Sequence, residues 1–190
     1  MSHHNSFTLN EDELRRTWFN PELILKDSGL QSGMVFSDVG CGDGFFSLLA
    51  ARIVGPSGTV YAVDSNVSVI EKLKCKAAEQ GLKNIQATVG RGEETIFCRQ
   101  CIDVVFYSMV LHDFDDSRKV LLNAKQMLRP HGILMNLDWK KKRMNFGPPQ
   151  HIRFSEARAS SLIKNAGFTI GNVKEAGLHH YVITAYAEIE

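Results

Sequence analysis

The stretch DVGCGDG, Asp38 to Gly44, decides the fold of this 190-residue chain. It ends a short apolar run, MVFSDV at 34–39, and precedes a helix predicted over 45–54. Its glycines at 40, 42 and 44 let the backbone turn tightly and let a ligand approach without a Cβ in the way. The helix would then present unpaired N–H groups in its first turn. The stretch therefore predicts a strand, a tight turn and a helix that together bind a ligand.

Strand-like and helix-like segments alternate along the rest of the chain. The strand-like segments are mostly continuous apolar runs, which is typical of a parallel sheet with helices on both faces. The short turn at Ala176-Gly177 predicts a closing hairpin, whose last strand would be antiparallel to the others. We expect one α/β domain over 1–190, with a doubly wound, Rossmann-like sheet. The predicted strands are 34–39, 59–64, 84–89, 102–107, 132–138, 169–175 and 180–188, and the predicted helices are 11–25, 45–54, 67–80, 116–128 and 155–165.

Asp64 strengthens the ligand-binding interpretation of the glycine loop. It ends the second predicted strand, 24 positions after Gly40, where a carboxylate can accept hydrogen bonds from both hydroxyls of a ribose. A dinucleotide loop would instead place its third glycine at position 45, which is Phe45. A tight turn without a ligand is the remaining alternative. It would not explain the acid at Asp38, because a buried acid needs partners.

Composition predicts a soluble globular protein without a polyanionic partner. The net charge is +1, so the chain has no overall bias toward nucleic acid or an anionic membrane. No apolar run approaches the ~20 residues needed to cross a bilayer, and the polar start at 1–13 does not resemble a signal peptide. We expect a cytoplasmic protein. The cysteines are not arranged as a disulfide framework and stand at 41, 75, 98 and 101.

The chain resembles the class I S-adenosylmethionine-dependent methyltransferases, particularly the small ubiquinone/menaquinone-biosynthesis-like and arsenite-methyltransferase-like branch. The resemblance implies a seven-stranded sheet in the order 3-2-1-4-5-7-6 with the last strand antiparallel. It also implies S-adenosyl-L-methionine as cofactor, S-adenosyl-L-homocysteine as product, and an N-terminal segment, 1–30, covering the cofactor site. The matching stretches are NPELILKDSGLQSGMVFSDVGCGDG at 20–44, the acid Asp64, VLHDFDD at 110–116, LRPHG at 128–132 and AGF at 166–168.

The resemblance also assigns residues to the cofactor. Gly40 and Gly42 would line its methionine moiety together with Cys41 between them, and Asp38 would organise this loop from beneath. Asp64 would hold the ribose hydroxyls. Two further groups complete the assignment: Ser65 beside the adenine, and the backbone carbonyl of Ser108 at the methionine amino group.

One position departs from the family pattern. Where the family often has G-D-A-E after the third strand, this chain has Gly90-Arg91-Gly92-Glu93. The acid that would accept a hydrogen bond from the adenine amino group is thus Arg91, which cannot accept one. We expect backbone groups of Gly92 and Glu93 to contact the ring instead.

His112 is the candidate catalytic residue, because it follows the fourth strand at the carboxyl edge, where open α/β sheets bind ligands. It would act as a base or orient an acceptor, while the alternative is a histidine that packs the loop against Asp113. Trp139, Lys140 and His180 are the candidate substrate-binding residues at the same edge. Each has a structural alternative as a rim tryptophan, part of a solvated KKKR loop at 140–143, or a turn residue.

We predict no metal site. Cys98-x-x-Cys101 is at most half of a zinc site and no second pair stands at a useful spacing, so we interpret it as structural. The predicted function is methyl transfer to a small-molecule acceptor by direct in-line displacement. Two alternatives stay open: a methyltransferase acting on RNA or protein, and a non-catalytic cofactor-binding subunit. The sequence assigns neither the acceptor nor an oligomeric state.

Overall fold

The strands form one seven-stranded sheet in the order β3-β2-β1-β4-β5-β7-β6, which confirms the predicted fold class. The computed structural model describes residues 10–187, so positions 1–9 of the N-terminal segment and position 188 of the last strand lie outside the described residues. The central strands β1 to β5 are parallel, whereas β7 is antiparallel to both β5 and β6. The strands are β1 Val35–Val39, β2 Thr59–Asp64, β3 Ile85–Val89, β4 Ile102–Ser108, β5 Leu128–Trp139, β6 Phe168–Ala176 and β7 His180–Ala187.

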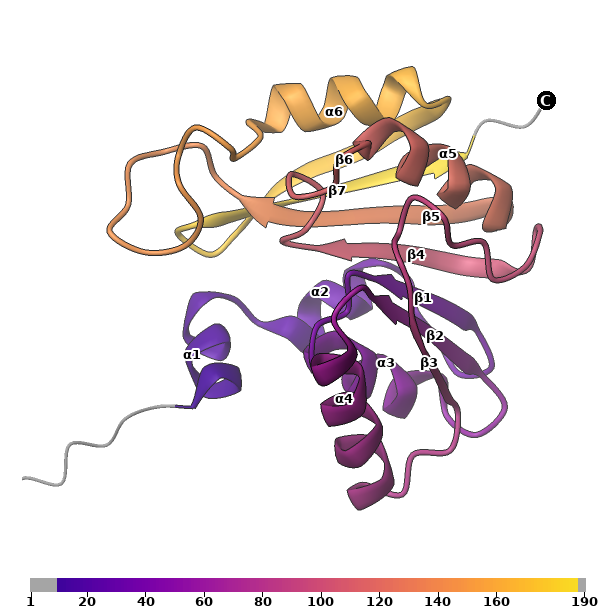
Figure 1. Cartoon of the computed structure of the whole chain (residues 1–190). Helices are drawn as coiled ribbons and strands as arrows, with labels where there is room; N and C mark the ends of the chain where they lie inside the picture. The colour runs from indigo at the N-terminus through magenta and orange to yellow at the C-terminus, as the bar shows by residue number, and fades with distance from the viewer. Residues whose placement is uncertain (1–9, 188–190) are drawn as a thin grey trace, which may run out of the picture.

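Six helices accompany the sheet in the described part of the chain (Figure 1). The prediction of a single helix over 11–25 is wrong, because the structure has two helices there, separated at Phe19 and Asn20. Pro21 disfavours the helical conformation for Asn20, whose side chain instead caps the second helix by accepting from the Leu23 N–H. Within residues 10–187, no helix is both long and apolar enough to cross a membrane. The helices are α1 Glu11–Trp18, α2 Pro21–Asp27, α3 Phe45–Val54, α4 Val67–Glu79, α5 Ser117–Met127 and α6 Glu156–Asn165.

The hydrophobic core has a layer on each face of the sheet. Side chains alternate between faces along a strand, so Val105 and Tyr107 of β4 join one cluster while Val104 and Phe106 join the other. The first cluster packs β4 against α5 and α6, and the second packs it against α2 and α3 (Figure 1). This arrangement leaves the ends of the parallel strands as the edges where loops can form a site.

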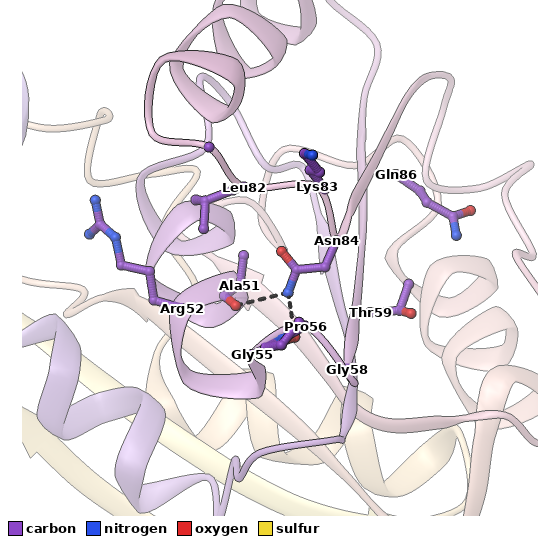
Figure 2. A pocket seen from close by; sticks show the side chains of 11 residues that line it. Ala51, Arg52, Gly55, Pro56, Gly58, Thr59, Leu82, Lys83, Asn84 and Gln86 are labelled. Carbon is purple, nitrogen blue, oxygen red and sulfur yellow. Dashed lines mark hydrogen bonds between the residues drawn. The ribbon is translucent and has the colours of Figure 1, made fainter.

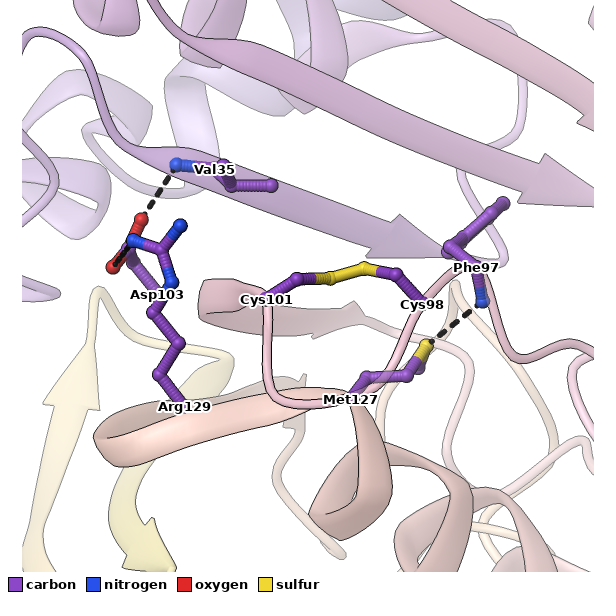
Figure 3. Close-up of a disulfide and its surroundings, with 7 residues drawn as sticks. All are labelled: Val35, Phe97, Cys98, Cys101, Asp103, Met127 and Arg129. Carbon is purple, nitrogen blue, oxygen red and sulfur yellow. Dashed lines mark hydrogen bonds and ion pairs between the residues drawn. A yellow bond between two sulfur atoms is a disulfide. The ribbon is translucent and has the colours of Figure 1, made fainter.

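The connection from β3 to β4, residues 90–101, contains no helix, although a crossover between parallel strands usually does. It covers the α5 side of the sheet with side chains of its own: Phe97 stacks on Tyr61 of β2, with 4.9 Å between ring centroids. Figure 3 shows Cys98 and Cys101 joined by a disulfide in the last turn of this connection. The sequence analysis found no disulfide framework, and it did not predict this single bridge between cysteines three positions apart. The structural interpretation of the pair agrees with its position.

A pocket of about 570 Å³ lies at the amino ends of β2 and β3, the opposite end of the strands from the glycine loop. Asn84 closes its floor (Figure 2): its side-chain N–H groups donate to the carbonyls of Ala51, at 2.9 Å, and Gly55, at 2.8 Å. Ala51 lies in the last turn of α3 and Gly55 is its C-cap residue; their carbonyls also accept from the N–H groups of Gly55 and Gly58, each at 3.1 Å. Asn84 therefore anchors the end of α3 to the start of β3.

We predict that Asn84→Ala lowers the free energy of unfolding by about 1–2 kcal/mol, because two hydrogen bonds to helix-terminal carbonyls are lost. Urea denaturation followed by circular dichroism measures the change. Gln86→Ala is the control, since this side chain also lines the pocket but is exposed. Equal destabilisation by the two variants would contradict the anchoring role of Asn84.

Candidate functional site

The glycine loop takes the shape that its sequence predicts. Gly40, Gly42 and Gly44 all have positive φ angles, of +77°, +55° and +91°. A Cβ on Gly40 would lie 2.6 Å from Cγ2 of Val110, and one on Gly44 would collide with Leu73. A Cβ on Gly42 would meet nothing within 4 Å. The outer glycines are thus required for close packing, and the middle one borders open space.

Asp64 holds this loop directly. Its Oδ2 accepts a hydrogen bond from the Gly42 N–H at 2.9 Å, and its Oδ1 accepts from the Asn66 N–H at 2.9 Å. A carboxylate has about four acceptor positions, so both oxygens keep the capacity to accept a further hydrogen bond from a ligand. The carboxylate is therefore a structural part of the loop and remains available to a ribose.

Asp38 lies beneath the loop and is almost fully buried. Its Oδ2 accepts from the Ser47 hydroxyl at 2.6 Å, whereas its Oδ1 has no partner among residues 10–187. Burial raises the pKa of Asp38 to about 6, and the nearby charge of Asp64 contributes in the same direction. Two neighbouring carboxylates with spare acceptor capacity fit a ligand that carries positive charge and N–H groups.

A pocket of about 280 Å³ opens beside the loop, at the carboxyl ends of the parallel strands. It brings together five of the predicted cofactor residues: Gly40, Asp64, Ser65, Gly92 and Glu93. It is closed by residues that the sequence analysis did not assign to the site, although they belong to the quoted VLHDFDD stretch. These are Val110, Asp113, Phe114 and Asp115.

The remaining predicted cofactor residues lie around this pocket and not in its wall. The Cys41 side chain is buried against α4, where it packs with Leu48 and Ile70, and burial raises the pKa of its thiol. Only its backbone belongs to the loop. Ser108 is half-buried at the end of β4, in register with Leu137 of β5.

His112 forms a buried pair with Asp138, the penultimate residue of β5. Nδ1 of His112 lies 2.8 Å from Oδ1 of Asp138, and its side chain is only 1% exposed. On the other side of the ring, Nε2 lies 3.4 Å from Oδ1 of Asp113. Burial acts to lower the pKa of His112, but the contact with Asp138 and its charge outweigh burial and raise it. Asp138 thus contacts one ring nitrogen, and Nε2, which is also buried, lies beside Asp113 of the loop; the catalytic role stays a prediction.

The predicted substrate residues belong to an aromatic cluster formed by Trp18, Trp139, Phe146 and His180. Trp139 and His180 are neighbours at the β5–β7 edge, with 4.1 Å between ring centroids, and Trp18 at the end of α1 covers both. His180 is fully buried and neither ring nitrogen has a partner among the described residues. Burial lowers its pKa to about 3, so this histidine is neutral at physiological pH.

The Nζ of Lys140 pairs with Glu175 of β6 at 2.7 Å. In the same KKKR segment, Lys142 donates to the Leu178 carbonyl at 2.6 Å. Both contacts fasten the loop after β5 to the β6–β7 hairpin, in agreement with the structural alternative for this segment.

Arg153 organises the same loop and was not assigned a role from the sequence. It is 1% exposed and lies over the Trp139 ring, 5.4 Å from the centroid. Its guanidinium donates to four backbone carbonyls of the loop. The acceptors are Lys140, Lys142, Phe146 and Pro148, at 3.4, 3.1, 2.9 and 2.7 Å.

Comparison with known proteins agrees with this geometry. Residues 30–151, more than half of the chain, match the family described as methyltransferase domain. The chain belongs to this methyltransferase family. The match confirms the predicted resemblance and the prediction of an S-adenosylmethionine-dependent methyltransferase domain.

Relatives of this methyltransferase domain act on different molecules. Nocamycin O-methyltransferase of Saccharothrix syringae is 36% identical over 100 residues, which are 53% of this chain and 36% of that protein. The ubiquinone/menaquinone biosynthesis C-methyltransferase UbiE of Haemophilus ducreyi is 32% identical over 129 residues, 67% of this chain and 49% of that protein. The chain thus spans half or less of the length of these curated relatives.

Among solved structures, a SAM-dependent methyltransferase from Aquifex aeolicus superimposes with a TM-score of 0.86 at 27% identity, covering 95% of this chain and all of that one. Geranyl diphosphate methyltransferase in complex with SAM has a TM-score of 0.77 at 14% identity, covering 93% of this chain and 88% of that one. The second likeness shows the fold alone.

We predict that Asp138→Asn lowers the pKa of His112, because a neutral amide no longer favours the imidazolium. Titration of the histidine ring resonances by NMR measures it. The folded-state pKa of wild-type His112 lies above its unfolded value, so the charged ring stabilises the fold below the unfolded pKa. This contribution is lost as the pH rises through the folded pKa.

Asp113→Asn is the matched control for this titration, since Asp113 is 54% exposed and its charge is screened by solvent. Its effect on the pKa of His112 should be smaller than that of Asp138→Asn. The reverse order would mean that Asp138 does not control the ring.

Proposed function

We propose that this methyltransferase domain transfers the methyl group of S-adenosylmethionine to a small-molecule acceptor by direct in-line displacement. The observation that carries the proposal is the carboxylate of Asp64, which accepts from the Gly42 N–H at the wall of the glycine-loop pocket. When bound, S-adenosylmethionine supplies a methyl carbon that its sulfonium has already made electrophilic. The chain then has to bind the cofactor and the acceptor, align them, and exclude water.

Each part of the pocket has a role in this proposal. Asp64 accepts from the ribose hydroxyls, and Ser65, Gly92 and Glu93 line the base. The loop at 40–42 and the carbonyl of Ser108 receive the amino-acid end. Asp38 contributes negative charge from beneath the loop, where its Oδ1 has spare acceptor capacity. The acidic character of Asp38 and Asp64 suits a ligand whose sulfonium and ammonium groups are cationic.

On the acceptor side, we propose His112 as the general base, with Asp138 as its positioning residue. Asp138 holds Nδ1, so Nε2 is the atom that removes a proton from an acceptor hydroxyl, amine or acidic carbon. Because Asp138 raises the pKa of His112, the ring becomes a base only as the pH rises through that value. Trp139 and His180 are buried beneath Trp18, so we assign them to the packing of the site and not to direct contact with the acceptor.

The contacts of the KKKR segment favour a small molecule over a nucleic acid. Two of its lysines, Lys140 and Lys142, are held by the β6–β7 hairpin, which leaves fewer of its four basic residues for a polyanion. The relatives named for antibiotic and quinone methylation support the same choice.

Binding of the cofactor is the first test. We expect isothermal titration calorimetry to detect S-adenosylmethionine and S-adenosylhomocysteine, and Asp64→Ala to weaken both by at least ~10-fold, since hydrogen bonds to a charged group are lost. Glu79→Ala is the charge-matched control, because Glu79 is exposed on α4. The absence of heat with either ligand would falsify the proposal.

The acceptor class has a separate test. The protein is incubated with methyl-labelled S-adenosylmethionine and a cell extract, and the extract is then fractionated by mass. We expect the label in a metabolite, and a reduced yield with His112→Gln at unchanged cofactor affinity. Label found only in RNA or protein would overturn the assignment of a small molecule.

A further inference from the structure

The rim of the cofactor pocket contains an ion pair between two loops. Arg91 follows β3 and Asp115 follows β4, and Nη2 of Arg91 lies 2.5 Å from Oδ2 of Asp115. Both residues line the pocket. Arg91 also lies 3.8 Å from Oε1 of Glu93, so the guanidinium stands between two carboxylates. The pair joins the two loops that face each other across the position proposed for the base.

A purine with a 6-amino group presents a hydrogen-bond donor on that edge, and specific binding requires an acceptor opposite it. Arg91 has only donors, so it cannot serve. Glu93 is buried and its Oε1 already accepts from the Asp115 N–H at 3.1 Å. Asp64 stands at the end of the pocket proposed for the ribose, and both of its carboxylate oxygens accept hydrogen bonds from backbone N–H groups.

Two acids remain, Asp113 and Asp115. The carboxylate of Asp113 is turned toward His112, with Oδ1 at 3.4 Å from Nε2. The carboxylate of Asp115 pairs with Arg91 through Oδ2 and is 81% exposed, and a carboxylate has further acceptor positions. Its backbone N–H donates to Glu93 and its side chain pairs with Arg91, so the carboxylate is kept at the rim.

The Phe114 ring forms the neighbouring part of the pocket wall. The pocket wall at Gly92 is in close contact with this ring, because a Cβ there would lie 2.8 Å from Cε1 of Phe114. The segment 113–115 therefore offers an aromatic surface and a carboxylate from adjacent positions. A planar base lying along this wall directs one edge to Asp115.

We propose that Asp115 is the specificity-determining acceptor for the 6-amino group of adenine, and that Arg91 is the residue that positions its carboxylate. This inference rests on the proposed binding of S-adenosylmethionine. Arg91 stands where the family often has an acid. In this inference, Arg91 instead holds an acid that the opposite loop supplies.

The test compares S-adenosylhomocysteine with S-inosylhomocysteine, whose 6-oxo group replaces the amino group. We expect the wild-type chain to bind the adenosyl compound at least ~10-fold more tightly by calorimetry, because the carboxylate accepts from an amino group and repels a carbonyl oxygen. Asp115→Asn should remove most of this preference, since an amide can donate to the 6-oxo group. Arg91→Met should reduce it partly.

Glu94→Gln is the matched control, because Glu94 is exposed and lies 4.0 Å from the same guanidinium. It should leave the preference unchanged. A preference that survives in Asp115→Asn, or that disappears in Asp113→Asn instead, overturns the assignment of Asp115 while leaving cofactor binding intact. If the wild-type chain binds neither compound, the proposed function itself fails, and this inference fails with it.

Discussion

The hydrogen bond from the Gly42 N–H to the Asp64 carboxylate joins the ends of two adjacent parallel strands, and the site depends on it. Two other N–H groups of the loop, at Gly40 and Cys41, donate to the Val63 carbonyl at 2.8 and 3.0 Å. The loop after β1 is thus held along its length by the end of β2. Its backbone cannot collapse into the crevice between the strands, and the carboxylate that holds it faces the same crevice. A loop already held in this way loses little conformational freedom when a ligand binds.

The two sides of the site have opposite physical character. The proposed cofactor side contains Asp38 and Asp64; burial and the charge of Asp64 raise the pKa of Asp38, and a cationic ligand bound there would relieve the repulsion. The proposed acceptor side adjoins the aromatic cluster, where the buried guanidinium of Arg153 donates to backbone carbonyls. This separation suits a reaction in which a charged donor meets a less polar acceptor, because each partner finds its own kind of surface.

The aromatic cluster also couples the N-terminus to the acceptor side. Trp18 ends α1 and stacks with Phe146 of the loop after β5, at 5.9 Å between centroids. At its other side, α1 contacts the glycine loop and the start of α3: Nη1 of Arg15 lies 4.0 Å from Oδ1 of Asp43, and its guanidinium lies over the Phe45 ring. That the N-terminal segment covers the cofactor stays a prediction.

What the sequence by itself determined is the part of the protein that depends on local chain chemistry. Glycines at 40, 42 and 44 can adopt positive φ, apolar runs form buried parallel strands, and an acid at the end of the second strand meets the loop of the first. The strand order came from the family resemblance, because periodicity alone does not rank neighbouring strands. Tertiary structure alone decided which distant residues meet. The pairing of His112 with Asp138 and the contact between Arg91 and Asp115 each join segments from different strands or loops. No spacing along the chain encodes such contacts, since they arise only when the sheet brings its carboxyl ends to one edge.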